Sequence, residues 1–147
     1  MAFLEPHQDG SCFHMTHVGL REVLARAGRM AAACRGEPPA SNPGLELGVF
    51  LADSWRAGRD KLTLRAVPPF DSFGAWMEQL VAESTGKGGR GIVPVVGEPD
   101  GLLDGKDHAY VELAGRESAD LGAEFYRWEV ATALAGAWMQ LNPFDQP

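Results

Sequence analysis

The sequence is poor in cysteine and in positive charge, and it has no long apolar run. Only 2 of its 147 residues are cysteines, Cys12 and Cys34, and they form no C-x-x-C pattern, so free thiols are expected. Lys and Arg number 13 against 20 Asp and Glu, and this net charge of -7 disfavours nucleic acid and anionic membranes. No stretch approaches the roughly 20 apolar residues of a bilayer span, and Glu5, His7 and Asp9 stand where a signal peptide needs an apolar core. These absences predict a cytoplasmic protein that binds neither nucleic acid nor membranes.

Hydrophobic residues make up 45% of the chain, which suffices for one core, so we expect a single domain over residues 1–147. Residue spacing predicts helices from about Thr16 to Cys34, Pro43 to Trp55, Asp71 or Ser72 to Glu83, and Ser118 or Asp120 to Leu141. Strands are predicted at Lys61 to Val67, Ile92 to Val96 and Asp107 to Leu113. This order of elements is typical of an α/β fold with a small, mostly parallel sheet.

Glu83 is the residue best placed for proton transfer. It lies at the end of the third predicted helix, directly before a loop that carries hydroxyls, glycines and the cations Lys87 and Arg90. Aldose-ketose isomerisation needs one base that takes a proton from C2 and returns it to C1, and a carboxylate on a rigid helix end can reach both carbons. Backbone N–H groups at glycines and the two cations suit an anionic sugar phosphate. On these residues alone, a solvated glutamate before a glycine helix stop stays an open alternative.

Other chemistry-bearing residues form weaker patterns. A P-loop is excluded because Val81 stands at its first glycine position and Gly88 at its Ser/Thr position. Glu98 follows a predicted strand and His108 opens another, so each could face a ligand or serve only a turn or packing. Four residues of metal-binding type near the N-terminus have a spacing that fits no structural zinc pattern: His7, Cys12, His14 and His17. We therefore expect no metal site.

Four segments form a set of motifs in a fixed order. They are F-G-A-W-M-E-Q-L-V-A-E-S-T-G-K (Phe73 to Lys87), G-I-V-P-V-V-G-E-P (Gly91 to Pro99), W-E-V-A-T-A-L-A-G-A-W (Trp128 to Trp138) and N-P-F-D-Q-P (Asn142 to Pro147). Together they resemble the glucose-6-phosphate isomerases, most closely the isomerase part of bifunctional transaldolase/glucose-6-phosphate isomerases. The stretches Asn42 to Gly48 and Gly58 to Thr63 fit the same branch.

The resemblance implies a sugar-isomerase (SIS) fold, a flavodoxin-like three-layer αβα sandwich, here incomplete. SIS domains are used in pairs with the active site between them, and this chain looks like the second, C-terminal isomerase half, with a helical lead-in over residues 1–40. The implied partners are a sugar phosphate, a first SIS domain or a transaldolase domain of the parent protein, and a second copy in a homodimer.

The resemblance also assigns roles to residues. The family's isomerisation base falls on Glu83, and the ring-opening histidine of a Q-H-A-F-like string falls on His108. Substrate or phosphate contacts are implied for Gln79, Ser84, Thr85, Gly86, Lys87 and Gln146. No metal or organic cofactor is implied. The family's phosphate-gripping Ser/Thr loop and its enediolate-stabilising Arg have no match in this chain.

The resulting hypothesis is an isomerase that interconverts glucose 6-phosphate and fructose 6-phosphate through a cis-enediolate, of which this chain holds about half the site. Because stabilising the enediolate is a large share of such catalysis, we expect the isolated chain to be inactive or weakly active. The alternative hypothesis is a non-catalytic phosphosugar-binding or dimerisation module, since one fold serves many functions.

Overall fold

The computed structural model describes residues 19–36, 38–98, 105–113, 115 and 117–145. Its helices are α1 (Leu20–Ala33), α2 (Pro43–Arg56), α3 (Phe73–Thr85) and α4 (Leu121–Trp138), with short 3₁₀ turns η2 (Pro39–Ser41) and η3 (Ser118–Asp120). Its strands are β1 (Lys61–Ala66), β2 (Val93–Val96) and β3 (His108–Leu113). Each predicted element is present, and the described ends differ from the predicted ones by no more than four residues. The predictions made for His7, Cys12, His14, Thr16, His17 and Gln146 lie outside the described residues.

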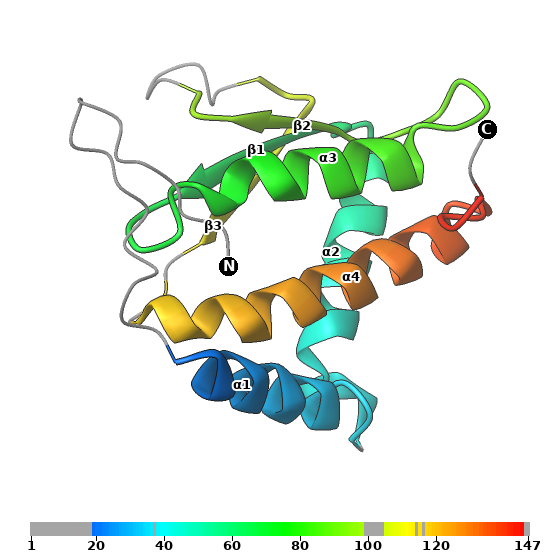
Figure 1. Cartoon of the computed structure of the whole chain (residues 1–147). Helices are drawn as coiled ribbons and strands as arrows, with labels where there is room; N and C mark the ends of the chain where they lie inside the picture. The colour runs from blue at the N-terminus through cyan, green and yellow to red at the C-terminus, as the bar shows by residue number, and fades with distance from the viewer. Residues whose placement is uncertain (1–18, 37, 99–104, 114, 116, 146–147) are drawn as a thin grey trace.

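The strands form a three-stranded sheet in the order β2-β1-β3, and both pairs are parallel. Helix α3 connects β1 to β2 and lies against the sheet, while α4 and α1 are stacked below it and α2 crosses behind α4 (Figure 1). The predicted fold class, an α/β arrangement with a small parallel sheet and an incomplete sandwich of helices, is confirmed.

Side chains alternate between the two faces of the sheet. Leu62 and Leu64 of β1 are buried and belong to the hydrophobic core, together with Ala109 of β3 and side chains from α2, α3 and α4. On the opposite face lie Val93, which is 53% exposed, and Tyr110, which is 40% exposed. The exposure of these two side chains shows that the described helices cover only one face of the sheet. Parallel sheets usually have both faces covered.

The sequence offers Ser41 or Asn42, before Pro43, as the start of α2, and the structure has Asn42 as its N-cap. Its Oδ1 accepts a hydrogen bond from the backbone N–H of Leu45 at 2.9 Å, and its Nδ2 donates to the carbonyl oxygen of Cys34 at 2.6 Å. One side chain therefore satisfies an otherwise unpaired donor of α2 and ties α2 to the end of α1.

We expect Asn42→Ala to lower the free energy of unfolding by about 1 kcal/mol, the usual cost of losing a helix N-cap. Urea unfolding followed by circular dichroism measures the change. Asn42→Asp is the matched control, because it keeps the accepting oxygen and loses only the donor to Cys34. If the Ala variant were no less stable than the Asp variant, the cap would contribute nothing.

The C-terminal end of α4 differs from its prediction. The apolar spacing predicts a helix to Leu141, but the helix ends at Trp138, and Gln140 has a φ of 58°. The backbone N–H of Leu141 then donates to the carbonyl oxygen of Gly136 at 2.8 Å. This left-handed turn ends the helix before Asn142-Pro143 and directs the following segment back across α4.

Arg26 of α1 forms ion pairs with the segment just before α4. Its guanidinium contacts the carboxylates of Glu22, Glu117 and Asp120, and the hydrogen bond from Arg26 is the main reason why the pKa of Glu22 lies below its ordinary value.

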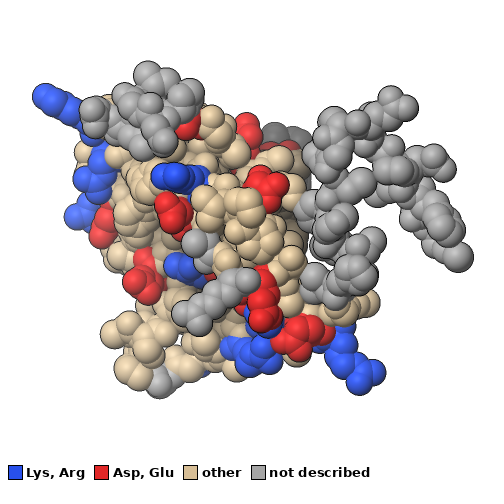
Figure 2. Space-filling model, turned by 90° about the vertical axis from the view of Figure 1, so that its left-hand side faces the viewer, with Lys and Arg blue, Asp and Glu red and all other residues tan. Residues whose placement is uncertain are grey.

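Acidic and basic side chains are interspersed on the face of the molecule drawn in Figure 2. None of the described helices is long and apolar enough to cross a membrane.

Candidate functional site

Glu83 lines a surface hollow of about 360 Å³, which we call the Glu83 hollow. Its walls come from the end of α3, from the middle of α4 and from the segment after α4, through Leu80, Glu83, Ser84, Glu129, Thr132, Ala133, Pro143 and Phe144. Two of the motifs noted in the sequence, E-S-T-G-K and N-P-F-D-Q-P, thus meet in space although some 60 residues separate them. The volume lies in the range of roughly 300 to 1,000 Å³ that is typical of small-molecule sites.

The amphipathic pattern of α3 places Glu83 on the outside of the fold. Phe73, Met77 and Val81 are buried, whereas Gln79 and Glu83 are exposed on another side of the helix. Residues four apart lie one above the other, and Gln79 Nε2 donates a hydrogen bond to Glu83 Oε1 at 3.2 Å. The structure therefore brings these two predicted site residues together and leaves the carboxylate accessible to a ligand.

Thr85 and Gly86 lie at the end of the same helix but do not line the hollow. Thr85 is completely buried, and its hydroxyl donates to the carbonyl oxygen of Val81 at 2.8 Å and accepts from the backbone N–H of Ile92 at 3.0 Å. A Cβ at position 86 would come within 2.6 Å of the carbonyl oxygen of Ala82, so a side chain does not fit there. Both residues connect α3 to β2.

The cations of the glycine-rich loop contact the C-terminal end of α4. Gly88 and Gly89 both have positive φ angles, 60° and 73°, as a tight turn between paired segments requires. Lys87 Nζ donates to the carbonyl oxygen of Asn142 at 2.8 Å, and Arg90 Nη1 donates to that of Met139 at 3.3 Å. Arg90 therefore stabilises the negative end of the α4 dipole, and Lys87 ties the loop to the segment that follows the helix. The described residues that line the hollow include the two carboxylates Glu83 and Glu129 and no Lys or Arg.

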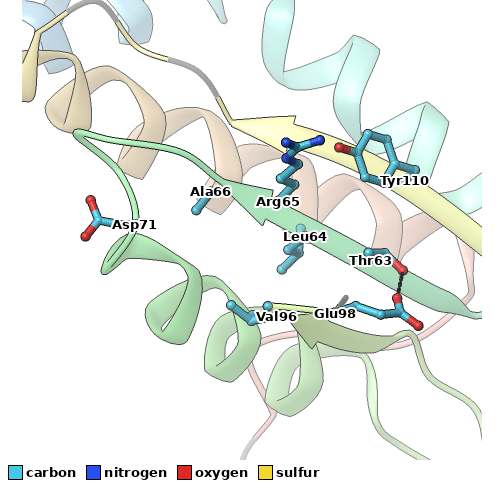
Figure 3. Close-up of a pocket in the computed structure, with 9 residues that line it drawn as sticks. Thr63, Leu64, Arg65, Ala66, Asp71, Val96, Glu98 and Tyr110 are labelled. Atoms are coloured by element: carbon cyan, nitrogen blue, oxygen red, sulfur yellow. Dashed lines mark hydrogen bonds between the residues drawn. The ribbon is translucent and has the colours of Figure 1, made fainter. Parts of the chain in front are cut away.

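His108 lies on the other face of the sheet, in a cluster with Thr63 and Glu98 that we call the Thr63 cluster. The hydroxyl of Thr63 donates to Glu98 Oε2 at 2.5 Å, as Figure 3 shows, and lies 3.3 Å from His108 Nδ1. His108 Nδ1 is also 3.7 Å from Glu98 Oε2, and the exposed fractions of the two side chains are only 19% and 9%. Because the hydroxyl proton of Thr63 points to Glu98, an N–H at Nδ1 of His108 would be the donor to the Thr63 oxygen.

A second, smaller hollow of about 150 Å³ adjoins this cluster near the carboxyl ends of β1 and β2. Thr63 and Glu98 line it together with Arg65, Asp71 and Tyr110 (Figure 3). Open α/β sheets usually hold ligands at this edge, but the volume is below the range of most small-molecule sites. We therefore take the Glu83 hollow as the candidate site. It is separate from the Thr63 cluster, and the described chain does not bring His108 to Glu83.

Lys61 forms ion pairs with Asp60 and Asp107 beside the Thr63 cluster. Lys61 Nζ lies 3.1 Å from Asp107 Oδ2 and 2.6 Å from Asp60 Oδ1. The hydrogen bond from Lys61 is the main cause that lowers the pKa of Asp107, and those from Asp60 and Asp107 raise the pKa of Lys61. A lowered carboxyl pKa favours the folded state at neutral pH, and this contribution is lost as the pH falls through the folded-state value.

We expect Lys61→Met to raise the pKa of Asp107 toward its ordinary value, because the variant removes the hydrogen-bonding cation and keeps the length of the side chain. Titration of the side-chain carboxyl carbons by ¹³C NMR measures the shift. Lys61→Arg, which keeps a hydrogen-bonding cation, is the matched control. An unchanged titration of Asp107 would show that Lys61 is not what holds its pKa down.

Part of the chain is similar to a known enzyme. Over 82 residues the chain is 34% identical to a glucose-6-phosphate isomerase of Methanocaldococcus jannaschii, a match that covers 54% of this chain. It covers 20% of that enzyme, so this chain spans about a fifth of the length of the curated relative. No family model matches the chain. The similarity supports a relationship to the glucose-6-phosphate isomerases, in line with the resemblance of the four motifs.

The sequence assigned no role to Glu129 and Thr132, although both line the Glu83 hollow. Each lies within the motif W-E-V-A-T-A-L-A-G-A-W, three residues apart and therefore on one side of α4. The available signal was a polar pair at helical spacing in an otherwise apolar segment. It indicates a shared face, but only the fold shows that this face lies opposite Glu83.

Proposed function

We propose that this chain carries the proton-transferring half of a glucose-6-phosphate isomerase site, with Glu83 as the base. The main support is that an accessible carboxylate on a rigid helix end shares a hollow of ligand size with the segment that follows α4. The similarity to an isomerase supports the same assignment.

The proposed chemistry is a proton shuttle between adjacent carbons. After the sugar ring has opened, Glu83 removes the proton from C2, the electrons of that C–H bond form the C1–C2 double bond, and the π electrons of the C1 carbonyl move to O1, which gives a cis-enediolate. The proton of the C2 hydroxyl passes to O1, the C2 oxygen becomes a carbonyl, and the electrons of the C1–C2 double bond take the proton back from the Glu83 carboxyl group at C1. The Gln79 amide, 3.2 Å from Oε1, would hold the carboxylate in one orientation while its other oxygen takes the proton.

The described hollow supplies the base but not the positive charge that the reaction needs. Its described lining contains two carboxylates and no cation, and Lys87 and Arg90 donate to backbone carbonyls. We propose that the groups that bind the phosphate and stabilise the enediolate belong to a partner. That partner is a first SIS domain, the remainder of a fused transaldolase-isomerase polypeptide, or a second copy of this chain. His108 keeps its proposed ring-opening role only if such a partner brings it to the substrate.

Exchange of hydrogen with solvent tests this proposal. In D₂O, a glucose-6-phosphate isomerase incorporates deuterium at C2 of glucose 6-phosphate and C1 of fructose 6-phosphate, which NMR detects directly. We expect incorporation with the full polypeptide, by which we mean this chain together with the partner half proposed above, and little with residues 1–147 alone. Absence of exchange with the full polypeptide would reject the isomerase assignment. An active enzyme would serve glycolysis and gluconeogenesis in the cytoplasm.

The second candidate function is a non-catalytic sugar-phosphate-binding or dimerisation module. The described lining holds no cation to stabilise an enediolate, which favours a module that takes only the uncharged, hydroxyl-bearing part of the sugar into this hollow. Calorimetry with fructose 6-phosphate, read together with the exchange measurement, distinguishes the two, because a module of this kind binds the sugar without any exchange of its C1 hydrogen.

A further inference from the structure

The Thr63 cluster consists of three polar side chains that are largely removed from water. Thr63 of β1 is 3% exposed, and the side chains of Glu98 and His108 are 9% and 19% exposed. Polar groups this far from solvent are normally hydrogen-bonded to one another, and a satisfied buried network favours one arrangement of its protons. The distances within the cluster indicate which arrangement that is.

Glu98 sets the direction of the hydrogen bonds. An ionised carboxylate only accepts, so the hydroxyl of Thr63 donates to Glu98 Oε2, at 2.5 Å. Because that hydroxyl has no second proton, its oxygen is left as an acceptor for His108 Nδ1, which lies 3.3 Å away. A neutral imidazole carries one N–H, so a proton on Nδ1 leaves Nε2 without one.

The other side of the imidazole ring faces a weaker acceptor. His108 Nε2 is 3.8 Å from Asp107 Oδ1, which is beyond hydrogen-bond distance, and the side chain of Asp107 is 50% exposed. The same carboxylate is also paired with Lys61. A neutral imidazole in water prefers its proton on Nε2. The contacts of the Thr63 cluster therefore oppose the intrinsic preference of the ring.

We propose that Glu98 and Thr63 are positioning residues for His108. Through the Thr63 hydroxyl, Glu98 holds a proton on Nδ1 of His108 and leaves Nε2 as the nitrogen that exchanges protons with a ligand. This inference deepens the proposed function, because it names the atom through which His108 would act in ring opening. It rests on that function only in giving His108 a sugar phosphate as its ligand, since the proton arrangement belongs to the chain without ligand.

Nitrogen NMR reads the tautomer of His108 directly. Two-bond ¹H–¹⁵N correlation spectra of the whole chain, labelled with ¹⁵N-histidine, distinguish a protonated ring nitrogen from an unprotonated one. The signals of His108 are those that are lost in His108→Gln. The pH is raised until these signals no longer move, so that the neutral ring is observed, and free histidine under the same conditions is the reference. We expect an N–H at Nδ1 of His108 and no proton at Nε2.

Two substitutions of Glu98 should move the proton by different amounts. Glu98→Leu removes the acceptor, so the Thr63 hydroxyl should donate to Nδ1 and the imidazole proton should move to Nε2, which reverses the tautomer. Glu98→Gln should give a mixture of tautomers, because an amide can accept from the hydroxyl or donate to it.

Two control variants should keep the wild-type tautomer. Thr63→Ser retains the hydroxyl that connects Glu98 to His108. Glu112→Gln makes the same chemical change as Glu98→Gln at an exposed glutamate of β3 that lies outside the cluster. A purely structural role of Glu98 would change the melting temperature of its variants without moving a proton between the two ring nitrogens.

The outcomes are distinct for the two proposals. A proton on Nε2 in the wild type, or one tautomer shared by the wild type and both Glu98 variants, would overturn the positioning role. If Glu98→Leu does not fold, Glu98→Gln decides, because it preserves the size of the side chain. None of these spectra concerns isomerisation, which deuterium exchange by the full polypeptide tests. A proton that moves with residue 98, together with absent exchange, would keep the positioning role and reject the isomerase.

Discussion

Replacing Glu83 by Gln is expected to lower the isomerisation rate of the full polypeptide by roughly 10²- to 10⁴-fold, the usual contribution of a positioned general base. The amide has nearly the same shape as the carboxylate but cannot accept the C2 proton. Because Glu83 is exposed and its described hydrogen bond comes from Gln79, the substitution should leave the fold intact. A coupled assay in both directions measures kcat and KM.

The decrease should appear in kcat, with KM changed little, since the carboxylate acts in the transition state more than in substrate binding. Glu78→Gln is the matched control. Glu78 is also an exposed glutamate of α3, but it does not line the Glu83 hollow, so this variant should keep wild-type activity. Normal turnover by Glu83→Gln, or equal losses in both variants, would rule out Glu83 as the base.

The sequence was sufficient to predict where the helices and strands lie, because the patterns that predict them involve only residues close together in the chain. Apolar spacing depends only on neighbouring residues, and the helices and strands follow it closely. The end of α4 is the exception. The apolar pattern continues to Leu141, but Gln140 adopts a left-handed conformation that no local residue preference predicts.

The arrangement of the site depended on contacts that the sequence does not contain. The motif placed Gln79 and Glu83 on one side of a helix, and the structure has them hydrogen-bonded there. That α4 supplies the opposite wall, through Glu129 and Thr132, follows only from how α3 and α4 pack on the sheet. His108 shows the same dependence, since its position at the start of β3 left open which face of the sheet its side chain would occupy.

Thr85 is a motif residue for which a ligand-binding role and a structural role can be distinguished. Its motif predicts a substrate or phosphate contact, whereas its hydroxyl bridges Val81 in α3 and the backbone N–H of Ile92, which is itself only 4% exposed. Removing this hydroxyl would leave a buried backbone donor without an acceptor. The cost of such a group is about 1 to 3 kcal/mol.

We therefore expect Thr85→Val to lower the free energy of unfolding of the chain by about 2 kcal/mol, measured by urea denaturation. Thr85→Ser, which keeps the hydroxyl, should lose much less. In the full polypeptide, the Val variant should keep near-normal KM at temperatures where it is folded, because Thr85 does not line the hollow. A Val variant with unchanged stability and a raised KM would instead assign the hydroxyl to the substrate. The comparison decides whether the threonine of E-S-T-G-K serves the ligand directly or holds the helix end on which Glu83 stands.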